Sequence, residues 1–299
     1  MLTWKAHDHP VYDLAFTPDG GLITSADDAT RLWDTASETQ IREWTDGYAL
    51  TLAVSPDGRM AAGAGSGQAL LWPIDGGRTL SLVRGVYEGQ FVAFRPNGIE
   101  LVGRGSSDNP LRRWAVPTGT ELIGQWPPFD YSDCIAGPLA FHPSGTTLAT
   151  GGFMLADLGP RLDKAVVFRN ADTGEQLARL CPSRSTSPPS RLTFSPDGKL
   201  LAGIYGPSLI LWDVASRVEV VRHQPSRKLF NGLAFTPDGT RLLTASNDES
   251  IRVWVAATWA ETTAYAWTVG KLGCVAVSAD GTLAAAGGST GKVVVWDLD

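Results

Sequence analysis

The chain has 299 residues, and its hydrophobic content of 43% together with eleven tryptophans is enough to build a large core. Its 25 Lys and Arg residues against 31 Asp and Glu residues give a formal net charge of −6. This balance argues against sequence-independent binding to nucleic acid, which needs many cationic side chains on phosphates.

The first 44 residues predict five short strands. An isolated strand is expected at 2–6. Residues 11–16 alternate between apolar and polar side chains, as strands do, and a Thr-Pro-Asp-Gly turn follows them. Three further strands are expected at 22–26, 29–33 and 39–44. Four short antiparallel strands in about 40 residues are the period of a propeller blade.

The same order of strands and turn recurs seven times along the chain. Each copy carries a motif of the type Leu-Ala-Phe-Thr-Pro-Asp-Gly, at residues 14–20, 52–58, 92–98, 139–145, 192–198, 233–239 and 275–281. Each third strand ends on an aromatic residue: Trp33, Trp72, Trp114, Phe168, Trp212, Trp254 and Trp296. The predicted fold is therefore all-β, a seven-bladed β-propeller of four-stranded antiparallel blades. It forms one domain over 1–299, with blades near 11–44, 49–83, 89–126, 136–180, 189–222, 230–267, and 272–299 plus 2–6.

The two ends of the chain complement each other. The last copy stops after three strands, at the Trp-Asp-Leu-Asp of residues 296–299. The strand at 2–6 precedes the first copy and has no blade of its own. We expect this strand to pair with the C-terminal blade as its fourth strand and to close the ring. Closure leaves only short, protected sheet edges, which limits edge-to-edge aggregation.

These motifs resemble the WD40 repeat family over essentially the whole chain. The Trp-Asp pair occurs at Trp33–Asp34, Trp212–Asp213 and Trp296–Asp297, and an Asp stands six residues before Trp at Asp27, Asp108 and Asp248. The chain departs from the family pattern at Ala6–His7, which replaces Gly-His, and at Phe168, which replaces Trp. The resemblance implies a buried side-chain network in the first blade, made of His7, Ser25 (or Thr24), Asp27 and Trp33.

A catalytic use of such a His-Asp-Ser set is the alternative, but the family's structural network accounts for these side chains without chemistry. His7 and His9 flank Asp8, yet the sequence offers no third metal ligand nearby, and zinc sites need three or four. Asp108 and Asp248 lack a matching histidine and are expected to be turn residues. The sequence therefore predicts no catalytic residue, no metal site and no cofactor.

The three cysteines, Cys134, Cys181 and Cys274, are far apart and show no Cys-x-x-Cys spacing. They indicate neither a disulfide framework nor a zinc site, and they favour a reducing compartment. Residues 1–10 lack the apolar segment of a signal peptide, and no apolar run is long enough to span a membrane. We expect a cytoplasmic protein without membrane or nucleic-acid partners.

Three long connections surround the fourth copy, at residues 127–137, 153–164 and 181–190. The blade topology of the family puts all three on one rim, opposite the Pro-Asp-Gly turns. Surface loops lengthen by drift at little cost, which is the alternative explanation. These loops nevertheless combine aromatic and cationic side chains, which dominate binding hot spots. The predicted partner-binding residues are Phe129, Tyr131, Phe153, Arg161, Lys164 and Arg184.

The resemblance implies a non-enzymatic protein–protein interaction scaffold that presents a propeller rim to a protein or peptide. It would act as a monomeric ring, either alone or as one module of a larger protein. A small-ligand or glycan-binding propeller is the alternative, but the positions equivalent to Tyr12 carry no repeated aromatic residue: Leu50, Gln90, Gly137, Ser190, Asn231 and Gly273. A propeller hydrolase or lactonase is disfavoured because the sequence offers no convergent acids, bases or metal ligands.

Overall fold

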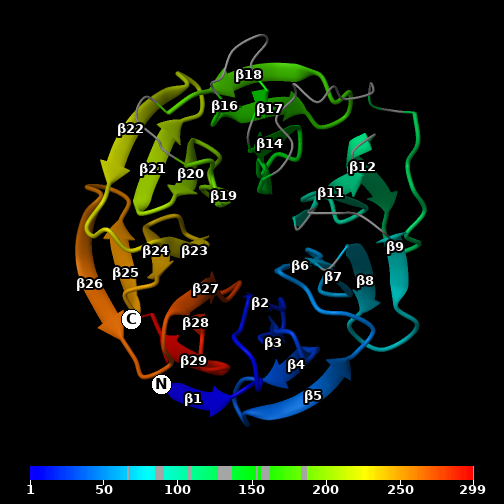
Figure 1. Cartoon of the computed structure of the whole chain (residues 1–299), viewed down its shortest axis with the longest axis vertical. Coiled ribbons are helices and arrows are strands. Elements are labelled where there is room, and N and C mark those ends of the chain that lie inside the picture. Colours follow the sequence, from blue (N-terminus) through cyan, green and yellow to red (C-terminus); the bar gives the residue numbers. More distant parts are fainter. Residues whose placement is uncertain are drawn as a thin grey trace.

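The computed structural model describes residues 1–65, 67–84, 91–106, 109–124, 126, 137–152, 154–155, 162–182 and 187–298. Every regular element in these residues is a β-strand, and none of them forms a helix. The sheets are arranged radially in a ring, as Figure 1 shows. The all-β propeller predicted from the repeat is therefore confirmed.

Each blade is an antiparallel sheet whose strands follow one another outwards from the ring centre (Figure 1). The first blade contains β2 (Asp13–Phe16), β3 (Leu22–Ser25), β4 (Thr30–Asp34) and β5 (Thr39–Trp44). The second contains β6 (Thr51–Val54), β7 (Met60–Gly65), β8 (Gln68–Pro73) and β9 (Leu80–Arg84). The fourth contains β13 (Leu139–Phe141), β14 (Thr147–Gly151), β17 (Val166–Asn170) and β18 (Gln176–Leu180). The strands of the first blade agree with their predicted ranges to within two residues.

The remaining blades follow the same order. The fifth contains β19 (Arg191–Phe194), β20 (Leu200–Tyr205), β21 (Ser208–Asp213) and β22 (Val218–His223). The sixth contains β23 (Phe230–Phe235), β24 (Arg241–Ser246), β25 (Ser250–Val255) and β26 (Ala260–Ala266). The third has three strands among the described residues, β10 (Val92–Phe94), β11 (Glu100–Ser106) and β12 (Asn109–Ala115). Where other blades have a fourth strand, Glu121 forms an isolated bridge with Trp114.

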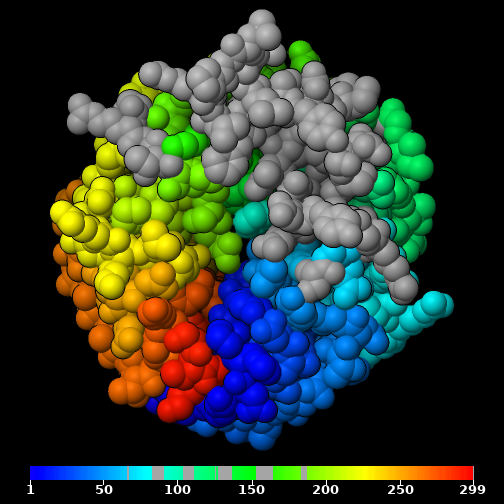
Figure 2. Space-filling view, viewed as in Figure 1, coloured from blue at the N-terminus to red at the C-terminus, as the bar shows by residue number. Residues whose placement is uncertain are grey.

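The seventh blade contains both ends of the described chain. Its strands are β27 (Leu272–Val277), β28 (Leu283–Gly288) and β29 (Lys292–Asp297), with β1 (Leu2–Lys5) as the outermost strand. β1 and β29 are antiparallel, with Trp4 opposite Val293. Figure 2 shows the first and last segments of the chain side by side on the surface. The predicted closure of the ring by the N-terminal strand is therefore observed.

The turn between the first two strands of each blade has the same physical basis. The glycine of the motif has a positive φ between 71° and 92° in all seven copies, which an L-residue with a side chain rarely adopts. In the fifth blade Ser195 Oγ donates to Asp197 Oδ1 at 2.7 Å, and the backbone N–H of Lys199 donates to the same oxygen at 3.1 Å. These hydrogen bonds, the one from Ser195 first, lower the pKa of Asp197.

The core lies between neighbouring blades rather than inside one. One cluster joins Leu209 and Leu211 of the fifth blade to Leu242 and Trp254 of the sixth. The third-strand tryptophan is buried in every blade that has one. Among the largest fully buried side chains are those of the second, third and fifth blades, Trp72, Trp114 and Trp212. Because each blade completes its neighbour's core, the ring depends on every interface, including the closing one.

Candidate functional site

The structure describes only one of the six predicted partner-binding residues. Phe129, Tyr131, Phe153, Arg161 and Arg184 lie outside the described residues. Lys164 is described, is half-buried, and lies two residues before β17. The described residues therefore do not test whether the six residues lie together, and the surface stays a prediction.

The flanking strands do place the three long connections. Because the strands of a blade alternate in direction, the end of β14 and the start of β17 lie on the same rim as the end of β18 and the starts of β13 and β19. Within the middle connection, β15 (Met154–Leu155) and β16 (Leu162–Asp163) pair antiparallel in a two-stranded sheet of their own. The insertion in the fourth blade thus includes regular structure.

A chain of hydrogen bonds crosses the first blade. Trp33 Nε1–H donates to Thr24 Oγ1 at 2.9 Å, and Thr24 Oγ1 lies 2.7 Å from His7 Nε2. His7 Nδ1 lies 2.8 Å from Asp28 Oδ1, and Arg31 lies 2.9 Å from the other oxygen of Asp28. With its proton on Nδ1, neutral His7 donates to Asp28 and accepts from the Thr24 hydroxyl, so both ring nitrogens are satisfied.

Two residues expected in this network have other partners. The acid that pairs with His7 is Asp28, whereas Asp27 accepts a hydrogen bond from the Tyr12 hydroxyl at 2.8 Å. Ser25 Oγ lies 3.1 Å from Thr30 Oγ1 and accepts from the backbone N–H of Ala49 at 2.8 Å. The turn between β3 and β4 contains two consecutive aspartates, and its curvature directs the second one towards His7.

The environment of His7 favours its neutral form. Burial of the imidazole is the main cause that lowers the pKa of His7, and the attraction of Asp28 opposes it. The side chain of His7 is completely buried, so no substrate can reach it in this structure. Ser25, which would be the nucleophile of a catalytic set, forms no hydrogen bond with His7 among the described residues. This arrangement is suited to holding strands together.

The sixth blade repeats part of this chain with a different ending. Trp254 Nε1–H donates to Thr244 Oγ1 at 3.1 Å, as Trp33 does to Thr24. Asp248 instead forms an ion pair with Arg252 at 2.6 Å and accepts from Ser250 within its own turn. Asp248 is therefore a turn residue here, as expected, while Asp108 lies outside the described residues.

Two charged residues near the ring centre were not singled out from the sequence. Asp13 begins β2 and accepts from the backbone N–H groups of Leu14, at 3.1 Å, and Leu52, at 2.8 Å. Burial raises the pKa of Asp13, and the positive charge of Arg191 opposes that rise. The bond to Leu52 crosses from the first blade to the second. Asp13 thus ties two inner strands together.

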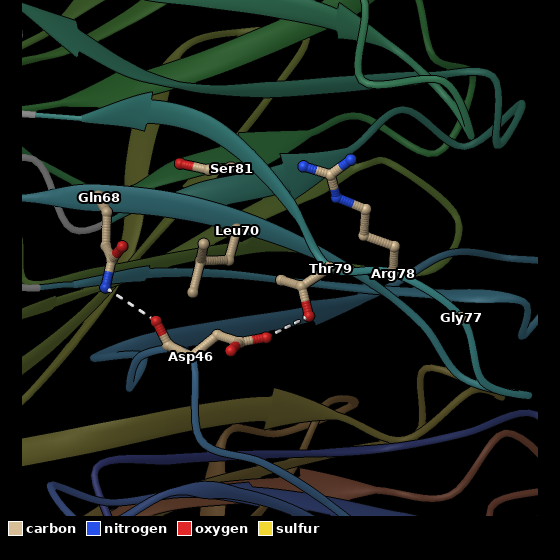
Figure 3. Close-up of a pocket in the computed structure, with 7 residues that line it drawn as sticks. All are labelled: Asp46, Gln68, Leu70, Gly77, Arg78, Thr79 and Ser81. Carbon is tan, nitrogen blue, oxygen red and sulfur yellow. Dashed lines mark hydrogen bonds between the residues drawn. The ribbon is translucent and has the colours of Figure 1, made fainter.

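A polar pocket of about 440 Å³ lies between the first and second blades (Figure 3). It is lined by Asp46, Gln68, Leu70, Gly77, Arg78, Thr79 and Ser81. The Asp46 carboxylate accepts from Thr79 Oγ1 at 2.7 Å, while the Arg78 side chain points away from Asp46 (Figure 3). This lining can hydrogen-bond a polar group but offers no histidine or thiol for acid–base or nucleophilic chemistry.

The described residues contain neither a metal-binding cluster nor a membrane-spanning helix. No group of three or more His, Cys, Asp or Glu side chains is placed there to hold a metal ion. No helix in this part of the chain is long and apolar enough to cross a membrane. Cys274 is buried, and burial raises the pKa of its thiol.

Comparison with known proteins finds similarity along most of the chain. The model of the family described as "WD domain, G-beta repeat" matches residues 1–34, 219–255 and 265–297. Protein tipD of Dictyostelium discoideum is 26% identical over 274 residues, which are 85% of this chain and 41% of that protein. WD repeat-containing protein slp1 of Schizosaccharomyces pombe is 28% identical over 172 residues, 54% of this chain and 32% of that protein. Echinoderm microtubule-associated protein-like 2 of Mus musculus is 25% identical over 268 residues, which are 84% of this chain and 37% of that protein. The chain thus spans about two fifths or less of the length of these relatives.

Proposed function

Since the chain belongs to the WD40 repeat family, we propose that it is a non-enzymatic scaffold that presents one rim of its propeller to a protein or peptide partner. The observation that carries this proposal is the position of the three long connections, which share one rim around the fourth blade. Every other blade connection on that rim is shorter, so this sector is where the ring departs most from its own repeat.

The chemistry of these connections supports a protein partner. Phe129, Tyr131 and Phe153 offer aromatic area, and Arg161, Lys164 and Arg184 offer cationic donors. Aromatic residues and arginine are enriched among the few side chains that carry most of the energy of an interface. We propose these six residues as the partner-binding surface.

The absence of a reactive group among the described candidates supports a non-enzymatic role. His7 is buried with both nitrogens hydrogen-bonded, and Cys274 is a buried thiol with a raised pKa. Cys181 and Cys274 are both free thiols, which is typical of a reducing compartment. We therefore place the scaffold in the cytoplasm, as a monomeric ring or as one module of a longer protein.

A pull-down from lysate of the source organism, with quantitative mass spectrometry, tests the proposal. The test variant replaces residues 154–162 by a Gly-Ser turn, and a second variant carries Phe153→Ala, Arg161→Ala and Arg184→Ala. The control carries Arg227→Ala, Lys228→Ala and Leu229→Ala, three exposed residues in the connection between β22 and β23, on the same rim. The control separates a specific surface from general rim charge.

We expect wild type and control to capture the same partner and both test variants to lose it by about tenfold or more, as removal of hot-spot side chains does. Equal capture by all four proteins would refute the fourth-blade surface. Capture of no protein by the wild type, with turnover or binding of a small molecule instead, would refute the scaffold function.

A further inference from the structure

A second depression lies on the opposite rim, between the Pro-Asp-Gly turn of the second blade and the Pro-Asn-Gly turn of the third. It has a volume of about 460 Å³. The buried side chain of Met60, 5% exposed, lies at its floor, and Val116 and Pro117 line it from the loop after β12. Ile99 also lines it and is 65% exposed. We call this depression the Ile99 groove.

The repeat itself shows that the fold does not require Ile99. This residue directly follows the glycine of its turn. The six equivalent positions carry polar residues or glycine: Gly21, Arg59, Thr146, Lys199, Thr240 and Thr282. The backbone turn is the same in all copies, with a positive φ at the glycine before this position. An exposed isoleucine at this site therefore adds nothing to the turn, yet leaves apolar area in water.

The same turn has also lost its charge while keeping its geometry. Five of the seven turns carry Asp at the position where the third blade has Asn97. Asn97 Oδ1 accepts from the backbone N–H of Ile99 at 3.2 Å, as Asp197 Oδ1 accepts from Lys199 at 3.1 Å. The amide thus supplies the acceptor that the turn needs. The turn of the third blade therefore adds no negative charge to the Ile99 groove and keeps that hydrogen bond; the turn of the second blade contributes Asp57.

A cation remains at this edge. Arg59 lines the groove and is exposed, and among the described residues its guanidinium donates no hydrogen bond. The Asp57 carboxylate also lines the groove and lies near enough to attract the charge of Arg59. The neighbouring Asp57 carboxylate is used within its own turn, where it accepts from Ser55 Oγ at 2.6 Å and from the Arg59 backbone N–H at 3.1 Å. The groove therefore combines apolar lining residues with an edge where the Arg59 donors are unused and the Asp57 carboxylate is hydrogen-bonded within its own turn.

The equivalent interface between the sixth and seventh blades provides an internal comparison. Its depression is smaller, about 150 Å³. There Arg241 occupies the position of Met60, and its guanidinium donates to the backbone carbonyl of Leu298 across the interface. The polar version of this corner is thus closed by the protein's own side chain. At the Ile99 groove this position is Met60, which has no donor for such a bond.

We infer that the Ile99 groove is a docking site for an acidic peptide segment with one large aliphatic side chain. The aliphatic side chain packs between Met60 and Ile99, and a neighbouring carboxylate pairs with Arg59. The site rests on the proposed function only in taking a peptide as partner, because it lies on the other rim and uses other residues. Apolar anchors supply affinity, and the exposed charge pair selects acidic over basic segments.

The test is a titration followed by NMR of methyl-labelled methionine and isoleucine. The probe is a capped peptide, Asp-Asp-Leu-Glu-Glu; one counterpart has lysine at every acidic position and another has serine for leucine. The variants are Ile99→Thr, which installs the residue of three other blades, and Arg59→Thr. Lys199→Thr is the matched control at the same turn position in the fifth blade. With three methionines in the chain, the Met60 signal is assigned by substitution.

We expect the acidic peptide to shift the Met60 and Ile99 methyl signals with a Kd in the millimolar range or below. Both counterpart peptides and both groove variants should bind more weakly, by about tenfold for Ile99→Thr and roughly threefold or more for Arg59→Thr. Lys199→Thr, and the variant with residues 154–162 replaced, should bind as the wild type does. The second of these keeps this result separate from the fate of the fourth-blade surface.

Three results would overturn the inference. The first is an unmoved Met60 signal up to the solubility limit of the acidic peptide. The second is equal affinity for the lysine counterpart, which would show that Arg59 selects nothing. The third is an unchanged Kd in Ile99→Thr while its fold, judged by the remaining methyl signals, is intact.

Discussion

Removing one tryptophan from the closing strand should measure how strongly the ring depends on its closure. Trp4 of β1 is 9% exposed and lies opposite Val293 of β29. Its ring centroid is 5.9 Å from that of Trp33 in the first blade. Trp4 therefore packs against the last strand of the chain and against the neighbouring blade. Trp4→Ala removes both contacts and leaves the backbone pairing of β1 in place.

The expected loss follows from the buried area. A tryptophan buries roughly 150–250 Å², and about 25 cal/mol per Å² makes this about 4–6 kcal/mol at nearly full burial. Measured Trp→Ala and Phe→Ala changes in cores cost about 3–5 kcal/mol. Native proteins are stable by only about 5–15 kcal/mol, so this substitution should remove a large part of the free energy of unfolding. Deletion of residues 1–5 should cost more, because it also exposes the edge of β29.

Urea unfolding followed by tryptophan fluorescence measures the free energy of unfolding, and light scattering after chromatography detects edge-to-edge association. Ile41→Ala is the control: Ile41 lies on β5, the outermost strand of the first blade, and is 57% exposed, so its loss should cost less than about 1 kcal/mol. If Trp4→Ala changed stability no more than the control, or if the deletion left the melting temperature unchanged, the closing strand would not hold the ring together.

Three further predictions concern buried or hydrogen-bonded charges. Glu100→Gln should destabilise the protein by about 3–5 kcal/mol, because it breaks the buried ion pair with Arg113. Glu219→Gln, in a partly exposed ion pair with Arg222, should cost about 1 kcal/mol or less. Urea unfolding measures both changes. Burial lowers the pKa of His7 in the folded state, so below about pH 6.5 the unfolded chain binds a proton that the folded chain does not. The free energy of unfolding should therefore fall as the pH drops below about 6.5, and His7→Asn should make it depend less on pH. An unchanged pH dependence in His7→Asn would contradict this. Burial first, and then the hydrogen bond to Asp27, raise the pKa of Tyr12 to about 12. A pH titration followed by tyrosine NMR should show this raised pKa, and Asp27→Asn should lower it. An unchanged Tyr12 pKa in Asp27→Asn would contradict the role of that hydrogen bond.

The sequence predicts the fold well because the information is repeated. A strand pattern that is ambiguous in one copy is constrained by six others, and the Pro-Asp-Gly turn sets where each pair of strands reverses. The N-terminal strand was predictable for a related reason, since the last copy lacks one strand and the first residues supply it. The third blade is less regular. The isolated bridge between Trp114 and Glu121 could not be predicted, because no repeated motif marks it in the sequence.

Side-chain partners were predictable only in part. His7 and Trp33 were predicted from the family pattern, and Thr24 was the alternative to Ser25, but the acid was assigned to Asp27, six residues before Trp33. Two aspartates follow each other in that turn, and a one-residue difference in curvature decides which carboxylate faces His7. Spacing in the sequence cannot resolve such a difference, because it depends on the backbone path between β3 and β4.

The Ile99 groove was not found from the sequence for a different reason. The repeat pattern shows which residues differ between copies, but it does not show which of these residues lie close together in the fold. In the structure, Met60 of the second blade and Ile99 of the third line the same depression, so two residues from different copies form one surface. Each blade of a propeller is a control for the others, since all must satisfy the same turn and the same packing. Where one copy keeps the hydrogen bond but drops the charge, as at Asn97, the turn does not require the change. Such positions are therefore the first to examine for binding in repeat proteins, ahead of positions at which all copies agree.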